Sequence, residues 1–380
     1  MKFVLAPDSF KESMSAKAAA LAMEKGIKTV FPDAECIIVP MADGGEGTVE
    51  SLVSMSDGEL IKLEVVGPTG KKVMAEYGLL SQEKTAVIEM ASASGLELIK
   101  PEERNPLLTT TYGTGQLIKH ALDNGVNRIL IGIGGSATND GGAGMLQALG
   151  VSFKDVNGEE LPFGGGALNH LHTIDMSGLD ERIKTVKVDV ACDVNNPLIG
   201  ENGASAIFGP QKGATPHMVK VLDQNLTHYA KLIKEHLDID VAQMPGAGAA
   251  GGLGAGLMAF LNAHLNKGID LVISYTGLEE LVKGADYVFT GEGSIDGQTL
   301  FGKTPYGVAT VARKYSVPVI AFAGKIGSGV EPLYEQGFHA IVGILRGVTT
   351  LEEALESGEA NLVFAAENVC RMLRLSSSKL

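Results

Sequence analysis

Two acidic segments come directly after short apolar runs near the start of the chain. Their polar residues are Asp8, Ser9 and Lys11 in residues 6–11, and Asp43 and Glu46 in residues 42–47. Carboxylates at the carboxyl ends of parallel strands can bind Mg²⁺ or accept a proton from an attacking hydroxyl. A lysine there can neutralise a phosphate or a carboxylate. The alternative is that these residues only cap the helices that follow. Two such segments after successive strands favour a functional site.

A glycine-rich segment, residues 132–142 (GIGGSATNDGG), follows a run of apolar residues that is typical of a buried strand. Glycines allow backbone N–H groups to face an anion, and the amino end of the next helix adds favourable potential. The segment therefore predicts a site for the phosphates of a nucleotide. The candidates are Gly134, Gly135 and Ser136 for phosphate, and Asn139 and Asp140 for nucleotide and Mg²⁺.

The same segment also satisfies the dinucleotide-binding pattern G-x-G-x-x-G/A, with Asp155 about twenty residues further on. This alternative would make the protein an NAD(P)-dependent oxidoreductase acting on a small hydroxy acid. Against it, the loop residues 138–142 separate the motif from the expected start of the helix. The pattern is weak by itself, particularly in a chain in which 49 of 380 residues are glycine.

A second glycine-rich segment, residues 246–254, opens another helix. It is either a phosphate-binding loop or a place where a helix packs closely against its neighbours. Its candidate ligands are Gly248, Gly251 and Gly252. The pattern G-x-x-x-x-G-K-[ST] does not occur, which excludes a standard P-loop ATPase.

Two further segments follow apolar runs in the second half of the chain. They supply Glu292, Asp296 and Lys303 in residues 290–305, and Asp193 and Asn195 in residues 191–198. A pair of carboxylates followed by a lysine suits a metal and phosphate site, and Asp193 is a candidate general base. In both places the alternative is a turn in which the acidic side chain binds its own backbone.

Short apolar strands that alternate with amphipathic helices predict an α/β fold with a largely parallel sheet. Strands are expected at residues 2–6, 35–40, 128–133, 185–192, 287–290, 317–323 and 340–345. A helix is expected from Ser15, its N-cap, to a stop at Gly26, and further helices are expected over residues 215–237 and about 351–373. Residues 60–66 and 73–80, joined by a Gly-Pro-Thr-Gly turn, predict an antiparallel hairpin.

At this hairpin, the alternation of strands and helices gives way to antiparallel strands, and this change predicts two domains. Residues 1–66 and 268–380 would form a discontinuous parallel α/β domain of the Rossmann or flavodoxin-like type. Residues 67–267 would form an inserted α/β domain with a mixed sheet. The active site is expected in the cleft between them.

Composition excludes several classes of protein. A formal net charge of −14 argues against sequence-independent binding of nucleic acid. Three widely spaced cysteines indicate neither a disulfide framework nor a zinc site, which fits a cytoplasmic protein. The chain starts with no signal peptide pattern. Residues 242–266 carry no charged side chain, but their glycines and Pro245 argue against a membrane helix.

Seven segments in their order along the chain resemble the type-1 glycerate kinase family. They are residues 6–13 (APDSFKES), 42–48 (ADGGEGT), 132–142 (GIGGSATNDGG), 191–198 (ACDVNNPL), 208–213 (FGPQKG), 248–254 (GAAGGLG) and 290–299 (TGEGSIDGQT). The resemblance covers essentially the whole chain. Gly297 stands where the family often has serine, and this departure does not touch the acidic residues.

The resemblance implies ATP-dependent phosphorylation of D-glycerate in organic acid metabolism, such as the glyoxylate route, with Mg²⁺ as the cofactor. Family members commonly make 2-phosphoglycerate, which is favoured here over 3-phosphoglycerate. The oligomeric state stays open, with a homodimer as the candidate assembly. The roles expected are catalysis for Asp8, Lys11 and Asp193; substrate binding for Ser9, Asn195, Lys212 and Lys303; phosphate binding for the two glycine loops; and metal binding for Asp43, Glu46, Asp140, Glu292 and Asp296.

Overall fold

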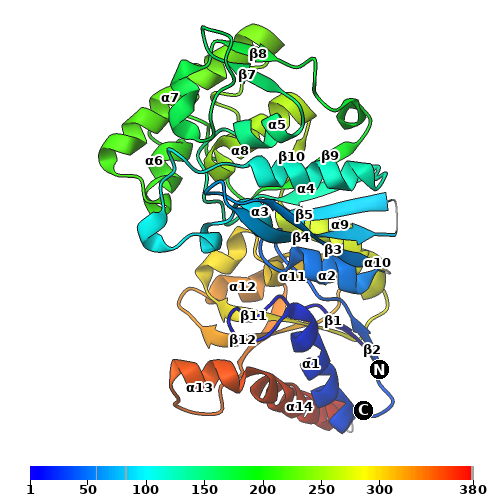
Figure 1. Ribbon diagram of the computed structural model, residues 1–380. Helices are drawn as coiled ribbons and strands as arrows, with labels where there is room; N and C mark the ends of the chain where they lie inside the picture. Colours follow the sequence, from blue (N-terminus) through cyan, green and yellow to red (C-terminus); the bar gives the residue numbers. More distant parts are fainter. Residues whose placement is uncertain (57, 82–83, 378–380) are drawn as a thin grey trace. The chain divides into compact units, whose positions relative to one another are not determined.

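The structure, a computed structural model, describes residues 1–56, 58–81 and 84–377. The chain divides into two compact units. Unit 1 comprises Met1–Asp43, Glu50–Met55 and Ile269–Leu380, and unit 2 comprises Gly44–Val49 and Ser56–Gly268. Each unit is described by itself (Figure 1).

Unit 1 contains a five-stranded sheet in which every neighbouring pair is parallel. Its order is β13–β12–β11–β1–β2, formed by β1 (Lys2–Leu5), β2 (Glu35–Ile38), β11 (Tyr287–Ile295), β12 (Val319–Ile326) and β13 (Phe338–Gly343). This is the flavodoxin-like strand order, and its direction reverses between β1 and β11. In such sheets, ligands bind outside the carboxyl ends of the strands at the point of reversal.

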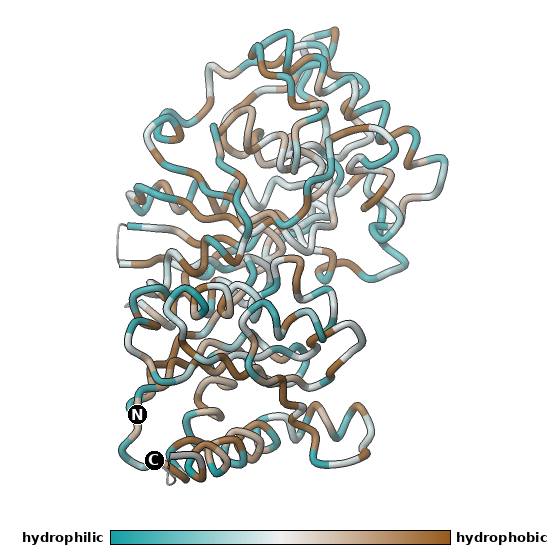
Figure 2. Tube along the Cα trace, turned by 180° about the vertical axis from the view of Figure 1, so that it is seen from behind, coloured by the Kyte–Doolittle hydropathy of each residue, from teal (hydrophilic) through white to brown (hydrophobic). Residues whose placement is uncertain are grey.

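The helices of unit 1 cover both faces of this sheet. They are α1 (Ala16–Val30), α2 (Thr48–Met55), α9 (Gly268–Thr276), α10 (Leu278–Val282), α11 (Thr304–Lys314), α12 (Glu331–Glu335), α13 (Leu351–Glu356) and α14 (Gly358–Ser377), with the 3₁₀ helix η7 (Gly297–Phe301). Figure 1 shows α1 and α14 side by side. In Figure 2, apolar and polar residues alternate along the turns of α14, as expected for a helix with one face in the core.

Two predicted helix boundaries in unit 1 differ from the structure. Helix α1 starts after the predicted N-cap Ser15, but it continues past Gly26 to Val30. Gly26 is needed for close packing, because a Cβ there would lie 2.5 Å from the carbonyl oxygen of Val363 on α14. The predicted single helix at residues 351–373 is divided into α13 and α14 at Ser357.

Unit 2 contains a six-stranded mixed sheet in the order β10–β9–β6–β5–β4–β3. The strands are β3 (Glu59–Val66), β4 (Lys72–Leu80), β5 (Thr85–Glu89), β6 (Arg128–Gly132), β9 (Lys187–Ala191) and β10 (His264–Asn266). The pairs β3–β4 and β4–β5 are antiparallel, and the other pairs are parallel. A separate antiparallel pair is formed by β7 (Ser152–Lys154) and β8 (Thr173–Asp175).

The helices of unit 2 enclose a core that includes Tyr77, Phe153 and Tyr229. They are α3 (Ala91–Ser94), α4 (Tyr112–Asp123), α5 (Ala143–Ala148), α6 (Ala204–Phe208), α7 (Pro216–Leu237) and α8 (Ala249–Leu261), with the 3₁₀ helices η2 (Leu96–Leu98), η3 (Pro101–Glu103), η4 (Gly165–His170), η5 (Glu181–Lys184) and η6 (Pro210–Lys212). The predicted fold class, a parallel-sheet domain with a second domain of mixed sheet, is confirmed.

The division of the chain differs from the predicted boundary at residue 66. Strand β3 pairs with β4 along its whole length in the sheet of unit 2. The two strands of a hairpin pair with each other and stay in one sheet. The long segment of unit 2 therefore begins before the hairpin, at Ser56. The segment Gly44–Val49 also belongs to unit 2, which no pattern in the sequence indicated.

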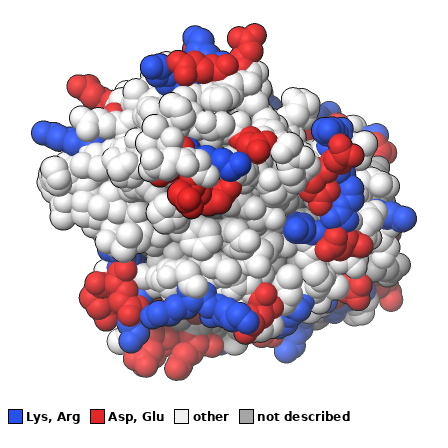
Figure 3. Space-filling view, turned by 45° about the horizontal axis from the view of Figure 1, so that its top comes forward, with Lys and Arg blue, Asp and Glu red and all other residues white. Residues whose placement is uncertain are grey.

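No helix among the described residues is long and apolar enough to span a membrane. The uncharged stretch at residues 242–266 instead forms α8 and β10. On the face shown in Figure 3, basic side chains mostly lie beside acidic ones.

Candidate active site

Asp8 lies at the strand-order reversal of unit 1, just beyond the carboxyl end of β1. The Asp8 backbone N–H donates to the carbonyl of Gly291 on β11, at 2.8 Å. The Asp8 carboxylate accepts hydrogen bonds from the backbone N–H of Ser9, at 2.6 Å, and from the hydroxyl of Thr304 at the start of α11. Burial, and then the negative charge of Asp43, raise the pKa of Asp8 to about 6, which suits a general base near neutral pH.

Glu292 lies on the neighbouring strand β11 and faces a lysine. The Lys303 ammonium group is 3.4 Å from the Glu292 carboxylate, and the Thr299 hydroxyl donates to that carboxylate at 3.2 Å. Burial raises the pKa of Glu292 to about 7, although the charge of Lys303 acts in the opposite direction. The sequence predicted a loop after residue 290, but β11 continues to Ile295, because Gly291, Glu292, Ser294 and Ile295 still pair with β12.

The carboxylates Asp8, Asp43 and Glu292 influence one another electrostatically. The charge of Asp43 raises the pKa of Asp8, and the charge of Asp8 raises that of Glu292. Among the described residues, no three acidic, histidine or cysteine side chains are grouped closely enough to hold a metal ion by themselves. Mg²⁺ is commonly held by one or two carboxylates together with substrate phosphates, and a divalent cation would relieve this mutual repulsion. The donor set therefore fits such an ion.

The other predicted residues of unit 1 lie close to this cluster in the chain but differ in exposure. Lys11 is exposed, Ser9 is half-buried, and Asp296 is half-buried as the N-cap of η7, where it accepts a hydrogen bond from the Gln298 N–H at 2.8 Å. The contacts of Asp296 in this structure are those of the alternative given above, a turn in which the acidic side chain binds the nearby backbone.

In unit 2, the glycine-rich segment forms a loop from the end of β6 to the start of α5 at Ala143. Gly134 and Gly135 are exposed, whereas Ser136 and the next four residues are buried. Gly135 has a φ of +72°, which favours glycine. The backbone N–H groups able to meet a phosphate are therefore those at the exposed end of the loop.

The second glycine-rich segment packs against the first. Ala250, Gly251 and Gly252 have φ values of +53°, +71° and +89°, so the chain makes a left-handed turn before α8 continues. A Cβ at Gly251 would lie 1.9 Å from the carbonyl oxygen of Thr138, and one at Gly248 would lie 2.1 Å from that of Pro197. The glycines Gly248, Gly251 and Gly252 are buried, so their visible role is close packing of backbone.

Three predicted polar residues are buried here: Asn139 and Asp140 within the first loop, and Lys212 against it. The Asp140 carboxylate accepts hydrogen bonds from the backbone N–H groups of Thr111, Gly142 and Gly144 and from the Thr111 hydroxyl. Asn139 donates from its side-chain amide to the Ser205 hydroxyl at 3.0 Å. Lys212 is 2% exposed. In this structure, Asp140 stabilises the loop, and its burial argues against a role in holding a metal ion.

Asp193 and Asn195 lie just beyond the carboxyl end of β9 and are exposed. The Asp193 carboxylate accepts a hydrogen bond from the Gly268 N–H at 3.0 Å, which links the ends of β9 and β10. Glu46, another predicted metal ligand, is exposed in the segment Gly44–Val49.

Sequence reasoning missed two residues that hold these segments in place. Thr304 donates to Asp8, and Glu89 accepts a hydrogen bond from the backbone N–H of Val49 at 2.9 Å. Burial raises the pKa of Glu89. Glu89 ends β5 without glycines or other acidic residues beside it, so it carried no motif, whereas Thr304 follows Lys303 and was within a predicted segment.

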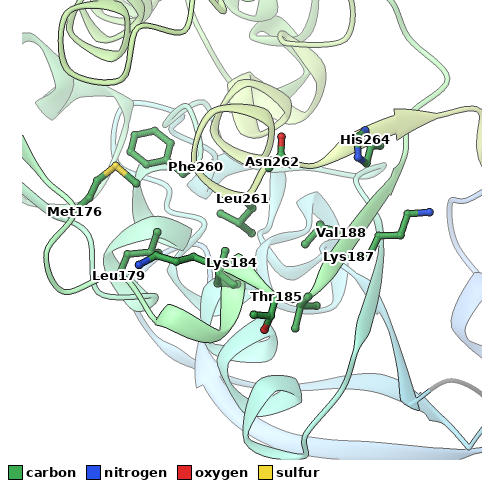
Figure 4. A pocket seen from close by; sticks show the side chains of 12 residues that line it. Met176, Leu179, Lys184, Thr185, Lys187, Val188, Phe260, Leu261, Asn262 and His264 are labelled. Atoms are coloured by element: carbon green, nitrogen blue, oxygen red, sulfur yellow. The ribbon is translucent and has the colours of Figure 1, made fainter.

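A cavity of about 350 Å³ in unit 2 lies away from these residues. It is lined by Lys187 and His264, the first residues of β9 and β10, and by Phe260 on α8 (Figure 4). The candidate site residues of unit 2 instead follow the carboxyl ends of β6 and β9. The cavity is therefore at the amino ends of these parallel strands, where ligands of α/β proteins rarely bind.

Comparisons with known proteins agree on one family. The profile of the glycerate kinase family matches residues 3–374. The chain is 56% identical over 366 residues to a glycerate kinase of Halalkalibacterium halodurans, covering 96% of both chains. It is 53% identical over 375 residues to the glycerate 2-kinase of Escherichia coli, covering 99% of this chain and 98% of the relative.

A solved structure agrees with these relatives. A crystal structure provisionally assigned as glycerate kinase 2 of Salmonella typhimurium LT2 superimposes with a TM-score of 0.92 at 50% identity, covering 100% of this chain and 99% of the other. These comparisons give no support to the oxidoreductase alternative. The chain therefore belongs to the glycerate kinase family and is, as its sequence predicted, a phosphotransferase.

Proposed function

We propose that this enzyme transfers the γ-phosphoryl group of ATP to a hydroxyl of D-glycerate, that Mg²⁺ is required, and that the product is 2-phosphoglycerate. The observation that carries the proposal is the cluster of Asp8, Glu292, Lys303 and Thr304 at the strand-order reversal of the five-stranded sheet. A basic carboxylate, further negative charge and a lysine are the groups that phosphoryl transfer to a hydroxyl requires.

In this mechanism, Asp8 accepts the proton of the glycerate hydroxyl as that oxygen attacks the γ-phosphorus in line. A pKa of about 6 leaves Asp8 mostly ionised at neutral pH yet basic enough to take a proton. The hydrogen bond from Thr304 orients the carboxylate, and its position at the amino end of α11 favours the ionised form. Asp193, which is exposed beyond β9, is the second candidate for the base.

Charge on the transferring group must be neutralised while it moves. When bound, Mg²⁺ would offset the negative charge of the phosphate groups, and the carboxylates that would hold it are among Asp43, Glu46, Glu292 and Asp296. Lys303 would assist from beside Glu292, and Lys11 and Ser9 would bind phosphate or the glycerate carboxylate, with Asn195 as a further substrate ligand. The exposed N–H groups of Gly134 and Gly135 would bind phosphate oxygens.

The choice of hydroxyl rests on the name of the Escherichia coli relative, which specifies the 2-position. The test is an ADP-release assay with ATP, Mg²⁺ and D-glycerate, followed by proton-coupled ³¹P NMR of the product. A phosphate ester on the CH carbon gives a doublet, whereas an ester on the CH₂ carbon gives a triplet. ADP release with a triplet would reject only the choice of the 2-hydroxyl. If ADP release does not depend on glycerate, the proposed reaction itself is rejected.

A further inference from the structure

We propose that Lys212 is a positioning residue that clamps the two glycine-rich loops of unit 2 together and so holds Gly134 and Gly135 in place to meet ATP. This inference rests on the proposed function, because the phosphate-binding role of the loop belongs to that proposal. It assigns Lys212 a different role from the direct substrate contact that the resemblance implied.

The contacts of the Lys212 ammonium group are all with the first loop. Its Nζ donates to the carbonyl oxygen of Thr138 at 2.6 Å and to the hydroxyl oxygen of Ser136 at 3.3 Å. These are its only hydrogen-bond partners among the residues that the structure describes. Because the side chain is buried, the ammonium group does not face solvent where a substrate would arrive.

Ser136 extends the clamp to the second loop. Its hydroxyl oxygen accepts from Lys212, and its one proton can be donated to the carbonyl oxygen of Ala250, 3.3 Å away. The Thr138 hydroxyl, 3.0 Å from the Ser136 hydroxyl, is then the donor of that pair. The two loops also meet directly, since the Gly141 N–H donates to the Gly251 carbonyl at 3.0 Å. With no space for a Cβ at Gly251, the loops form one tightly packed layer beneath the exposed Gly134 and Gly135.

The helix that carries Lys212 is held in place independently. Arg104 donates from its guanidinium group to the carbonyl of Gln211 at 3.3 Å. Gly213, with a φ of +90°, lies so close to Arg104 that a Cβ would be 2.5 Å from the Arg104 carbonyl oxygen. The lysine therefore reaches the loop from a fixed backbone, as a positioning residue requires.

Charge around Lys212 is balanced within the same unit. Burial lowers the pKa of Lys212 to about 7, while the nearby Asp140 favours its charged form. Both a charged and a neutral amine can donate two hydrogen bonds, so the contacts with Thr138 and Ser136 persist in either state. A methionine of similar length would fill the space without donating, which makes it a suitable test.

The experiment compares Lys212→Met, Ser136→Ala and a control, Lys220→Met, in which an exposed lysine on α7 is replaced. Hydrogen exchange, measured by mass spectrometry on the ligand-free enzymes, gives the exchange rates of the backbone amides in the two loops, in particular those of Thr138 and Gly141. The Thr138 amide donates to Ser136 Oγ, and the Gly141 amide donates to Gly251. Steady-state kinetics then give kcat and the KM for ATP and for D-glycerate.

We expect exchange in residues 134–142 and 248–252 to accelerate about tenfold in Lys212→Met, with other segments unchanged, and less in Ser136→Ala. The KM for ATP should rise about tenfold, with a smaller change in the KM for D-glycerate and none in Lys220→Met. A higher KM with unchanged loop exchange would make Lys212 a direct ligand and overturn the inference. Unchanged exchange and unchanged KM would also overturn it.

Two further outcomes are separable. If Lys212→Met does not fold, Ser136→Ala decides, because it removes only a hydroxyl group; no local acceleration in that variant would overturn the clamp. In the wild-type enzyme, ATP should slow exchange in residues 134–142. If ATP turns over without protecting this loop, the proposed phosphate site fails, whereas the clamp is still judged from the ligand-free exchange.

Discussion

Asp8 is under opposing influences that together make it suitable as a base. Burial and the charge of Asp43 disfavour its ionised form, whereas hydrogen bonds from Ser9 and Thr304 favour it. The balance leaves a carboxylate that is more basic than an exposed one but still ionised at neutral pH.

Replacing this carboxylate should separate catalysis from binding. We expect Asp8→Asn to lower kcat by about 10²–10⁴, the usual contribution of a general base, with little change in either KM. The ADP-release assay measures this, with Asp33→Asn, an exposed aspartate of unit 1, as the control. If Asp8→Asn keeps near-native kcat while Asp193→Asn loses it, the base is Asp193.

The same substitution should change how stability depends on pH. Because the pKa of Asp8 is raised from 3.8 to about 6, the folded state binds more protons than the unfolded state between those values. The free energy of unfolding therefore falls as pH rises through this range. Glu292, raised from 4.5 to about 7, acts in the same direction up to that pH.

In Asp8→Asn, residue 8 no longer titrates, so the variant does not undergo the part of this fall in the free energy of unfolding that Asp8 causes. Relative to wild type, the variant should gain up to about 2 kcal/mol between pH 4 and pH 8, a value reduced for partial exposure. Urea unfolding at the two pH values measures the difference. A constant difference between variant and wild type across this range would contradict the raised pKa.

At the scale of elements, the start of α11 controls the ionisation of Asp8. The hydrogen bond from Thr304 lowers the pKa of Asp8, so its loss should raise that pKa further. We expect Thr304→Val to shift the acid limb of kcat/KM to higher pH, leaving about threefold less of its pH 8 activity at pH 6 than wild type retains. The control is Thr310→Val, an exposed position on the same helix. An acid limb that moves to lower pH would contradict this assignment.

The left-handed turn at the start of α8 is the second element whose geometry decides the site. Gly251 and Gly70 both have positive φ, but a Cβ at Gly251 would clash with Thr138, whereas a Cβ at Gly70 meets nothing within 4 Å. Gly70→Ala should cost about 1 kcal/mol of stability from backbone strain alone, and Gly251→Ala at least about 3 kcal/mol. Denaturant unfolding of the two variants tests this, and equal losses would mean that the loops separate easily.

At the scale of the whole molecule, substrate binding should stabilise the folded enzyme. ATP at about 100 times its Kd adds about 2.7 kcal/mol to the free energy of unfolding. We expect a higher Tm with ATP and Mg²⁺ and a smaller shift with ATP and EDTA, because the carboxylates of unit 1 repel an unpaired triphosphate. NAD(H) should give no shift. A shift with NAD(H) and none with ATP would revive the oxidoreductase alternative.

The acidic residues of the site were predictable because they follow strands. Apolar runs ended before Asp8, Asp43 and Asp193, and carboxyl ends of parallel strands are where α/β proteins place ligands. The same patterning predicted the fold class, which depends on local periodicity and the alternation of elements. Seven ordered motifs predicted the family, which the comparisons confirm.

Other features depend on contacts between residues distant in the chain. Gly26 was predicted as a helix stop, and the segment with Gly251 as either a phosphate-binding loop or a place of close packing. In the structure, the two glycines pack against the backbone at Val363 and Thr138. A glycine has the same local signature whether it faces a phosphate or another backbone. Glu89 had no motif, because its partner Val49 lies 40 residues away in the chain.

By itself, the sequence determined which residue types stand at the strand ends, and with them the fold class and the kind of chemistry, because these follow from local order along the chain. The tertiary structure decided that Asp8 and Glu292 flank one strand-order reversal, that Asp140 is buried within the first glycine-rich loop, and that Lys212 is buried against that loop. The physical reason is that pKa, burial and hydrogen bonding depend on neighbours in space, which only the folded chain brings together.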